Sequence, residues 1–264
     1  LDVLNEKLAL VSLGRKKEDC LDLPQKIYEQ VIVELSADER RAYDAMHKDM
    51  IAWLESEEIG EQPTMAQART FATRYLRLRQ IADGLVSEGV GERFEFSKAR
   101  SKIKAAVEAW QDAGRRRCVV WFQFVLVGAS LASQFGQQDT TSWYIAGKVS
   151  ARERDRAIRQ WQGSENGVLV AQMDTAGEGL NLQAADLQIF VDMPTTPRQR
   201  RQCVDRLHRI GQHRPVTIVD VVARRTVDVS TRRKLGTKIQ VADNVEAAAY
   251  GRTVEEWKEA MRYE

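Results

Sequence analysis

Hydrophobic residues in the first third of the chain are spaced for one strand and two long helices. The segment Lys26 to Leu35 alternates apolar and polar residues, which predicts a strand. Ser36 and Glu39 form a capping box for a helix that should run to about Ser56. A second helix is expected over roughly Met65 to Val86. This pattern predicts a helical region ahead of the main domain.

Short apolar runs alternate with amphipathic segments from Ser97 onward. The expected strands cover Cys118–Phe122, Ser142–Ile145, Gly167–Ala171, Leu187–Val191 and Val216–Val222. The expected helices cover Lys98–Ala113, Val125–Phe135, a segment from the Ser150–Glu153 capping box to Trp161, a segment from Pro197, and Val227–Ile239. Continuous apolar strands separated by helices predict an α/β fold with a parallel sheet covered on both faces. Ligands in such sheets bind at the carboxyl ends of strands, where the loop 172–182 falls.

The pattern divides the chain into three parts. Residues 1–96 are expected to be an inter-lobe segment and helical region, 97–240 the α/β lobe, and 241–264 a C-terminal docking helix. In the last part, Thr253 and Glu256 form another capping box, and Trp257 and Met261 share one face. That helix would dock on the lobe itself or on a partner.

Composition excludes several classes of protein. Forty basic residues against 38 acidic ones give a net charge of only +2, so no global field attracts nucleic acid. The three cysteines are far apart and the three histidines are few, which argues against a zinc site and a secreted disulfide scaffold. No apolar run reaches transmembrane length, and we expect no membrane association. Basic charge is instead local: one segment holds Arg198, Arg200, Arg201, Arg206, Arg209 and Arg214, with Asp205 as its only acid.

That basic segment has a particular order. Gln202, Arg206 and Arg209 follow one another at spacings of four and three, so a helix would carry them on one face. Guanidinium groups are suited to gripping phosphate oxygens. Charge runs are usually only solvated helix faces. The full order Gln-x-x-x-Arg-x-His-Arg-Ile-Gly-Gln is too particular for that alternative.

A glycine-rich turn lies about twenty residues upstream of that helix. It follows the expected buried strand and reads Thr175-Ala176-Gly177-Glu178-Gly179-Leu180-Asn181-Leu182. Glycines there let a backbone approach phosphates closely. By itself, such a turn is more often a plain connection between a strand and a helix.

Together the two segments resemble the last and the fifth motif of the Swi/Snf branch of superfamily-two helicase-like ATPases. The resemblance implies arginine fingers at Arg206 and Arg209, which would stabilise charge on the γ-phosphoryl group of ATP. His208 could act as a general base, but we favour a motif residue that packs or hydrogen-bonds beside the nucleotide cleft. The resemblance also implies nucleotide contacts at Gly179, Asn181 and Gln202, and DNA-backbone contacts at Gln123, Thr175, Ala176 and Gly177. The commoner form of the fifth motif has Ala-Gly where Thr175-Ala176 stands here, which weakens the DNA-side assignment.

Further segments resemble the same family from residue 10 to 240. Val119 to Phe124 resembles its fourth motif, and Leu76 to Ile81 its Leu-Arg-x-x-Gln helix. The remaining matches are Gly14–Asp19 with Leu23-Pro24, and Tyr144–Gly147 with Arg152–Trp161. The resemblance implies the second, C-terminal RecA-like lobe, a three-layer fold, of a DNA translocase stimulated by double-stranded DNA.

Two motifs of such an enzyme are missing. The chain has no Gly-x-x-x-x-Gly-Lys-Ser/Thr and no Asp-Glu-x-His after an apolar strand. The resemblance therefore implies an N-terminal RecA-like lobe, in the same or a separate chain, that holds ATP and the magnesium ligands. The start at Leu1 fits a second lobe cut from a longer protein or encoded apart. Without that lobe we expect this chain to be inactive, and with it an intracellular ATP hydrolase at DNA.

Two other functions compete with this hypothesis. A non-catalytic DNA-binding or regulatory lobe would explain the missing phosphate-binding loop, but it has no use for the arginines at 206 and 209. A Rossmann-type cofactor enzyme fits poorly, because no Gly-x-Gly-x-x-Gly follows the first strand of the α/β region.

Overall fold

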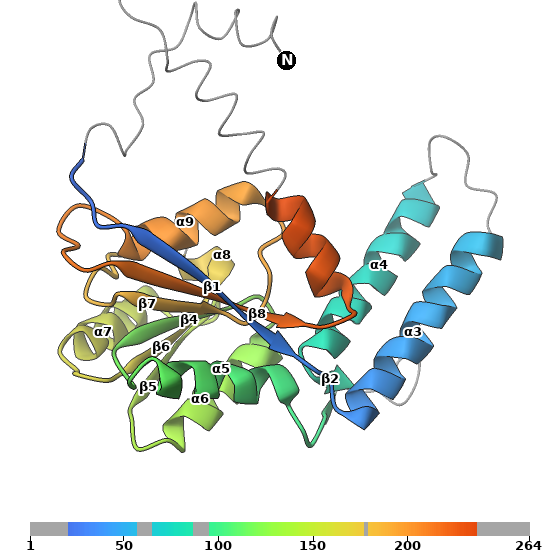
Figure 1. Cartoon of the computed structure of the whole chain (residues 1–264), viewed down its shortest axis with the longest axis horizontal. Helices are drawn as coiled ribbons and strands as arrows, with labels where there is room; N and C mark the ends of the chain where they lie inside the picture. Colours follow the sequence, from blue (N-terminus) through green and yellow to red (C-terminus); the bar gives the residue numbers. More distant parts are fainter. Residues whose placement is uncertain (1–20, 57–64, 87–94, 177–178, 237–264) are drawn as a thin grey trace, which may run out of the picture.

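A parallel six-stranded sheet forms the centre of the computed structural model (Figure 1). The structure describes residues 21–56, 65–86, 95–176 and 179–236. The strands are β1 (Lys26–Val33), β4 (Cys118–Phe122), β5 (Ser142–Ile145), β6 (Val168–Gln172), β7 (Leu187–Phe190) and β8 (Val216–Ala223). Their order is β1-β8-β7-β4-β6-β5, with every neighbouring pair parallel. The predicted α/β fold is confirmed.

Helices cover both faces of the sheet. One face packs on α5 (Ser101–Asp112) and α6 (Val125–Gly136), and the other on α7 (Ala151–Gln162) and α9 (Pro197–Leu207). Side chains of β4 alternate between the two cores, as the period of a strand requires. Trp110, Trp121 and Trp161 are fully buried in these cores. The three-layer arrangement therefore follows from continuous burial of the central strands on both sides.

Strand β1 extends the sheet across the predicted boundary at residue 97. All of its residues pair in parallel with β8, from Lys26 opposite Val216 to Val33 opposite Ala223. Its pattern of exposure reflects its place at the edge of the sheet, where Tyr28 and Ile32 remain 59% and 54% exposed. The α/β lobe thus includes a strand from the segment that the sequence assigned to the inter-lobe region.

The two helices expected ahead of the lobe form an antiparallel pair that projects from it (Figure 1). They are α3 (Ala37–Ser56) and α4 (Met65–Ala82). The predicted end of the second helix, at Val86, is wrong. Gly84 turns the chain with a φ of +90°, and the next two residues form β2 (Leu85–Val86), which pairs with β3 (Glu95–Phe96).

Predicted helix starts are confirmed where capping residues marked them. Ser150 and Glu153 make a full capping box at α7, and Thr196 caps α9 with Pro197 in its first turn. Residues 227–236 are helical, as expected for the segment that begins at Val227. Ile239 and the predicted docking helix 241–264 lie outside the described residues.

The capping box at α3 also joins the helical pair to the lobe. Glu39 accepts a hydrogen bond from the backbone of Ser36 at 2.9 Å, and its side chain is fully buried. The same carboxylate accepts hydrogen bonds from the hydroxyls of Ser97 and Ser101 and from the backbone of Ser101. Burial alone raises the pKa of Glu39, but the hydrogen bonds from Ser101 and Ser97 outweigh it, so the pKa lies below its ordinary value. One carboxylate therefore fixes the start of α3 against the start of α5.

Replacing Glu39 by Ala should lower the free energy of unfolding by about 2–4 kcal/mol at neutral pH, because several buried donors lose their acceptor. Urea denaturation measures this change. The lowered pKa adds stability that is complete above the unfolded-state pKa and is lost as pH falls through the folded-state value. The loss of unfolding free energy at low pH should therefore be smaller in Glu39→Ala than in the wild type.

Glu108→Ala, at an exposed position of α5, is the control and should change the free energy of unfolding by less than about 0.5 kcal/mol. A Glu39→Ala variant as stable as this control would contradict the assignment.

Candidate functional site

The arginine helix is shorter than predicted. Helix α9 ends at Leu207, and His208 leaves the helical conformation with φ −89° and ψ 80°. The prediction that Gln202, Arg206 and Arg209 share one helix face is therefore wrong for Arg209, which lies in the following turn. The side-chain amide of Gln212 donates to the carbonyl of Leu207 at 3.4 Å and so satisfies a backbone group that the end of the helix leaves open.

The turn after α9 packs on the glycine-rich segment. The backbone amide of Leu182 donates to the carbonyl of Arg206 at 3.1 Å. The buried amide of Gln212 donates to the carbonyls of Gln183 at 3.1 Å and Ala185 at 2.8 Å. Gly211 has a φ of +94°, and a Cβ there would come within 3.0 Å of the Gln183 side chain. The structure thus brings together the two segments that the sequence singled out.

The residues predicted to contact nucleotide do not all lie at this junction. Gly179 is exposed, with a φ of +74° and no atom within 4 Å of a Cβ placed on it. Asn181 is also exposed, and its side-chain oxygen accepts a hydrogen bond from the backbone of Gln183 at 3.3 Å. Arg206 and Arg209 are half-buried. An open glycine, an exposed amide and two guanidinium groups thus lie on adjoining segments.

Gln202, one turn before Arg206 on α9, lines a hollow between α8 (Met173–Ala176) and α9. The hollow has a volume of about 330 Å³ and is lined by Met173, Asp174, Thr195, Thr196, Arg198, Gln199 and Gln202. The short helix α8 was not predicted, because four residues are too few for a helical period to be visible in the sequence. Through Gln202, helix α9 faces the edge of the sheet that carries the predicted DNA contacts.

The predicted DNA-side residues Gln123 and Thr175 meet at the carboxyl ends of β4 and β6. The side-chain nitrogen of Gln123 donates to Asp174 at 2.7 Å, and its oxygen accepts from Gln199 at 3.1 Å. Thr175 donates to the side-chain oxygen of Gln172 at 3.2 Å, and the backbone amide of Gly147 donates to the same oxygen at 3.0 Å. The ends of β4 and β6, the loop after β5 and helix α9 therefore contribute to one polar edge.

Several members of this polar edge were missed by sequence reasoning. Gln172, Asp174 and Gln199 carry no motif signal of their own. Gln172 and Asp174 nevertheless fall in the loop that was expected to hold ligands. The side chain of Ala176 and all of Gly177 lie outside the described residues, so their predicted role stays a prediction.

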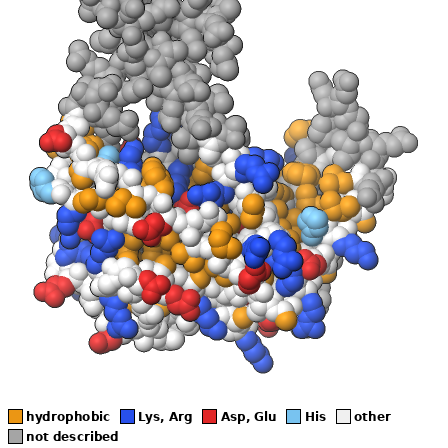
Figure 2. Space-filling view, in the orientation of Figure 1, with side chains coloured by type: hydrophobic (Ala, Val, Ile, Leu, Met, Phe, Trp, Pro, Cys, Tyr) orange, Lys and Arg blue, Asp and Glu red, His pale blue; other side chains and the backbone are white. Residues whose placement is uncertain are grey.

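Two arginines of the basic segment pair with acids that are distant in sequence. Arg200 is buried, pairs with Asp220 at 2.7 Å, and its guanidinium carbon lies 3.9 Å from the centre of the Phe190 ring. Arg214 pairs with Asp186 at 3.1 Å. Basic and acidic side chains are interspersed on the face of the lobe shown in Figure 2. The basic segment is therefore less positive in space than in sequence.

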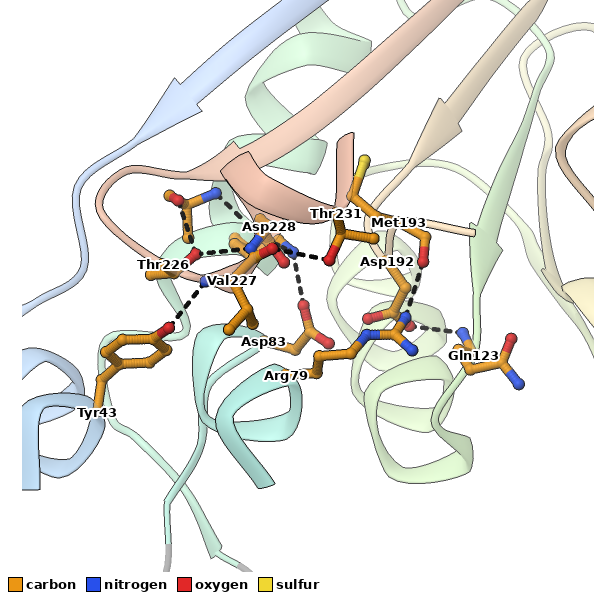
Figure 3. A network of polar contacts seen from close by, with 12 residues as sticks. Tyr43, Arg79, Asp83, Gln123, Asp192, Met193, Thr226, Val227, Asp228 and Thr231 are labelled. Atoms are coloured by element: carbon orange, nitrogen blue, oxygen red, sulfur yellow. Dashed lines mark hydrogen bonds and ion pairs between the residues drawn. The ribbon is translucent and has the colours of Figure 1, made fainter. Parts of the chain in front are cut away.

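A buried network of charges lies beneath Gln123 (Figure 3). The ammonium group of Lys102 contacts Asp83 at 2.6 Å and Asp228 at 2.7 Å, with all three side chains buried. Burial alone would lower the pKa of Lys102, but Asp228 and Asp83 raise it above its ordinary value. Burial and the neighbouring Asp192 hold the pKa of Asp83 well above its ordinary value.

Asp192 carries this network to the polar edge. Its carboxylate accepts hydrogen bonds from the backbone amides of Gln123 at 2.5 Å and Phe124 at 3.4 Å. Beside it, Arg79 donates to the carbonyl of Met193 at 2.7 Å. Helix α4, helix α5 and the ends of β4 and β7 are thereby joined, and the backbone of Gln123 is fixed. Sequence reasoning missed Lys102, although its spacing of four from Ala106 places it on the buried face of α5.

Two further observations concern the part of the chain that the structure describes. None of its helices combines the length and apolar character needed to cross a bilayer. No group of three His, Cys, Asp or Glu side chains in these residues is placed to hold a metal ion.

The sequence of the chain is similar to those of known helicases. Residues 101–211 match the helicase conserved C-terminal domain. Over 227 residues the chain is 27% identical to an uncharacterized ATP-dependent helicase, MG018, of Mycoplasma genitalium, covering 85% of this chain and 21% of the relative.

A second relative and a solved structure both carry SWI/SNF-type names. The chain is 29% identical over 212 residues to a SWI/SNF-related matrix-associated actin-dependent regulator of chromatin subfamily A-like protein 1 of Xenopus tropicalis, covering 73% of this chain and 22% of that protein. The chain spans less than a quarter of each of these two curated relatives. The SWI2/SNF2 ATPase core of Sulfolobus solfataricus, solved in complex with double-stranded DNA, has a similar fold, with a TM-score of 0.66 and 24% identity over 92% of this chain and 51% of that one.

Replacing Lys102 by Met should destabilise the lobe by about 3–5 kcal/mol, because the carboxylates of Asp83 and Asp228 lose the cation between them. Chemical denaturation followed by circular dichroism gives the free energy of unfolding. Lys104→Met, on the exposed face of the same helix, is the matched control and should cost less than about 0.5 kcal/mol. Equal stabilities of the two variants would show that the network does not hold the helical pair to the sheet.

Proposed function

We propose that this chain, which is a Snf2-like helicase C-terminal lobe, is the second motor lobe of an ATPase and translocase stimulated by double-stranded DNA. The observation that carries the proposal is the hydrogen bond from the Leu182 backbone to the Arg206 carbonyl. It joins the glycine-rich segment to the arginine segment, which supports a site to which both segments would contribute groups that bind phosphate. The N-terminal RecA-like lobe, in the same or a separate chain, would complete the enzyme.

On the nucleotide side, Arg206 and Arg209 would act as arginine fingers. Their charge would stabilise the γ-phosphoryl group of ATP as the bond breaks, an effect that can be worth about a thousandfold or more in rate. Gly179 and Asn181 would contact the nucleotide from the adjoining loop, because both are exposed there. Gln202 would contact the nucleotide from α9, where it lies one turn before Arg206.

ATP would be used with magnesium, whose ligands would come from the other lobe. No group of three His, Cys, Asp or Glu side chains in the described residues is placed to hold a metal ion. This lobe would contribute the positive charge of Arg206 and Arg209 and would position both side chains. Closure of the two lobes on ATP would bring both arginines to the γ-phosphate, and hydrolysis would release them.

On the DNA side, Gln123 and Thr175 would contact the phosphate backbone, together with Ala176 and Gly177. Amide, hydroxyl and backbone N–H groups are common phosphate donors, and they fix position without reading sequence. The related Sulfolobus core was solved in complex with double-stranded DNA. Each cycle of closure would move this edge along the duplex. Such a motor would work inside the cell, wherever its DNA is.

Replacing Arg209 by Ala in the two-lobe enzyme should lower kcat by about a thousandfold while changing the affinity for DNA by less than about threefold. The reason is that the guanidinium would act on the transition state and not on the duplex. Steady-state ATP hydrolysis at saturating DNA gives kcat, and fluorescence anisotropy of a labelled duplex gives the Kd for DNA.

Arg152→Ala is the control for this experiment, since it removes an exposed arginine from α7, a helix that carries neither of the proposed fingers. Turnover near wild type in Arg209→Ala would exclude the finger role. It would favour a lobe that binds DNA or regulates without taking part in hydrolysis.

A further inference from the structure

The carboxylate of Asp174 lies at the proposed DNA-facing edge, where a negative charge is unfavourable for a phosphate. It is exposed to solvent on the short helix α8. One of its oxygens accepts a hydrogen bond from the side-chain nitrogen of Gln123 at 2.7 Å, and the other accepts from Gln199 at 2.6 Å. A single carboxylate thus engages two amides from different elements.

The amides of Gln123 and Gln199 are oriented by a chain of contacts. The nitrogen of Gln199 also donates to the oxygen of Gln123 at 3.1 Å, and the oxygen of Gln199 accepts from the backbone of Thr195 at 3.3 Å. Each amide can donate through nitrogen only, so this pattern directs both nitrogens toward Asp174. At least one N–H of each amide that could bind a phosphate at this position is therefore directed at an acceptor of the protein itself.

A neighbouring pair of donors binds an acceptor that carries no charge. The hydroxyl of Thr175 and the backbone amide of Gly147 both donate to the side-chain oxygen of Gln172, at 3.2 and 3.0 Å. That acceptor carries no charge, so it does not repel an approaching phosphate. Asp174 differs because it carries the same negative charge, and presents the same kind of paired oxygens, as a backbone phosphate.

We propose that Asp174 is an internal substitute for a DNA phosphate, which lowers the affinity of this edge for duplex DNA by occupying the amides of Gln123 and Gln199. The proposal rests on the proposed function, because it concerns the same DNA-facing edge. When duplex binds, a phosphate oxygen replaces the carboxylate as the acceptor for these amides. Asp174 therefore sets how readily this lobe releases and regains the backbone.

The first test measures the affinity of the full 264-residue chain for a fluorescein-labelled duplex by anisotropy. Asp174→Ala should bind about 3-fold to 10-fold more tightly than the wild type at low salt, since one repulsive charge is removed and two donors are released. The gain should shrink as salt is raised, because screening weakens the repulsion. Asp155→Asn removes an exposed acid from α7 and should change the Kd by less than about twofold. Thermal melting of each variant checks folding.

A second test separates occupancy of the amides from charge alone. Asp174→Ala is measured again in a Gln199→Leu background, where one of the two amides is absent. If Asp174 acts by holding the amides, its removal should gain clearly less in that background than in the wild type. An equal gain in both backgrounds would overturn the proposal, because the carboxylate would then act without the amides.

The outcomes also distinguish this inference from the proposed function. Tighter binding by Asp174→Ala, together with a smaller gain in the Gln199→Leu background, supports the inference, including the case in which the wild type binds too weakly to measure. Unchanged or weaker binding by a folded Asp174→Ala variant, beside measurable binding by the wild type, overturns the inference and leaves the DNA role intact. No binding by either protein would overturn the DNA role of this lobe and the inference with it.

Discussion

The contact between the glycine-rich segment and the end of α9 determines the geometry of the rest of the site. The Leu182 amide reaches the Arg206 carbonyl, and the buried amide of Gln212 fastens the same turn to two carbonyls of the neighbouring segment. Buried backbone groups must find partners, so these bonds fix where the chain runs between β6 and β8. The two arginines and the exposed residues of the loop are placed as a consequence.

A second constraint is electrostatic and lies inside the lobe. Lys102 is buried between two carboxylates, and a third carboxylate, Asp192, holds the backbone of Gln123. Buried charges are costly unless each has a partner, so the helical pair, the sheet and the polar edge are bound to one arrangement. The surface charges behave differently. Within the basic segment, Arg200 pairs with Asp220 and Arg214 pairs with Asp186, so part of its positive charge is neutralised, and polar donors form the proposed DNA-facing edge.

Sequence periodicity and capping signals predicted most of the fold. The alternation of apolar runs predicted the parallel sheet, and the starts of α3, α7 and α9 were marked by Ser36, Ser150 and Pro197. Events that depend on distant residues could not be predicted. The place of β1 in the sheet depends on pairing with a strand nearly two hundred residues away. The motifs identified the candidate arginines, whereas Asp174, Gln199 and Lys102 became visible only through their contacts in space.

The central claim is that these residues form half of a nucleotide site that another lobe completes. Steady-state ATP hydrolysis tests it most directly, measured with magnesium for this chain alone and for the two-lobe enzyme that contains it, each with and without duplex DNA. The account predicts DNA-stimulated turnover only when both lobes are present. Clear DNA-stimulated turnover by this chain alone would mean that a complete nucleotide site lies within these 264 residues, and it would contradict the account.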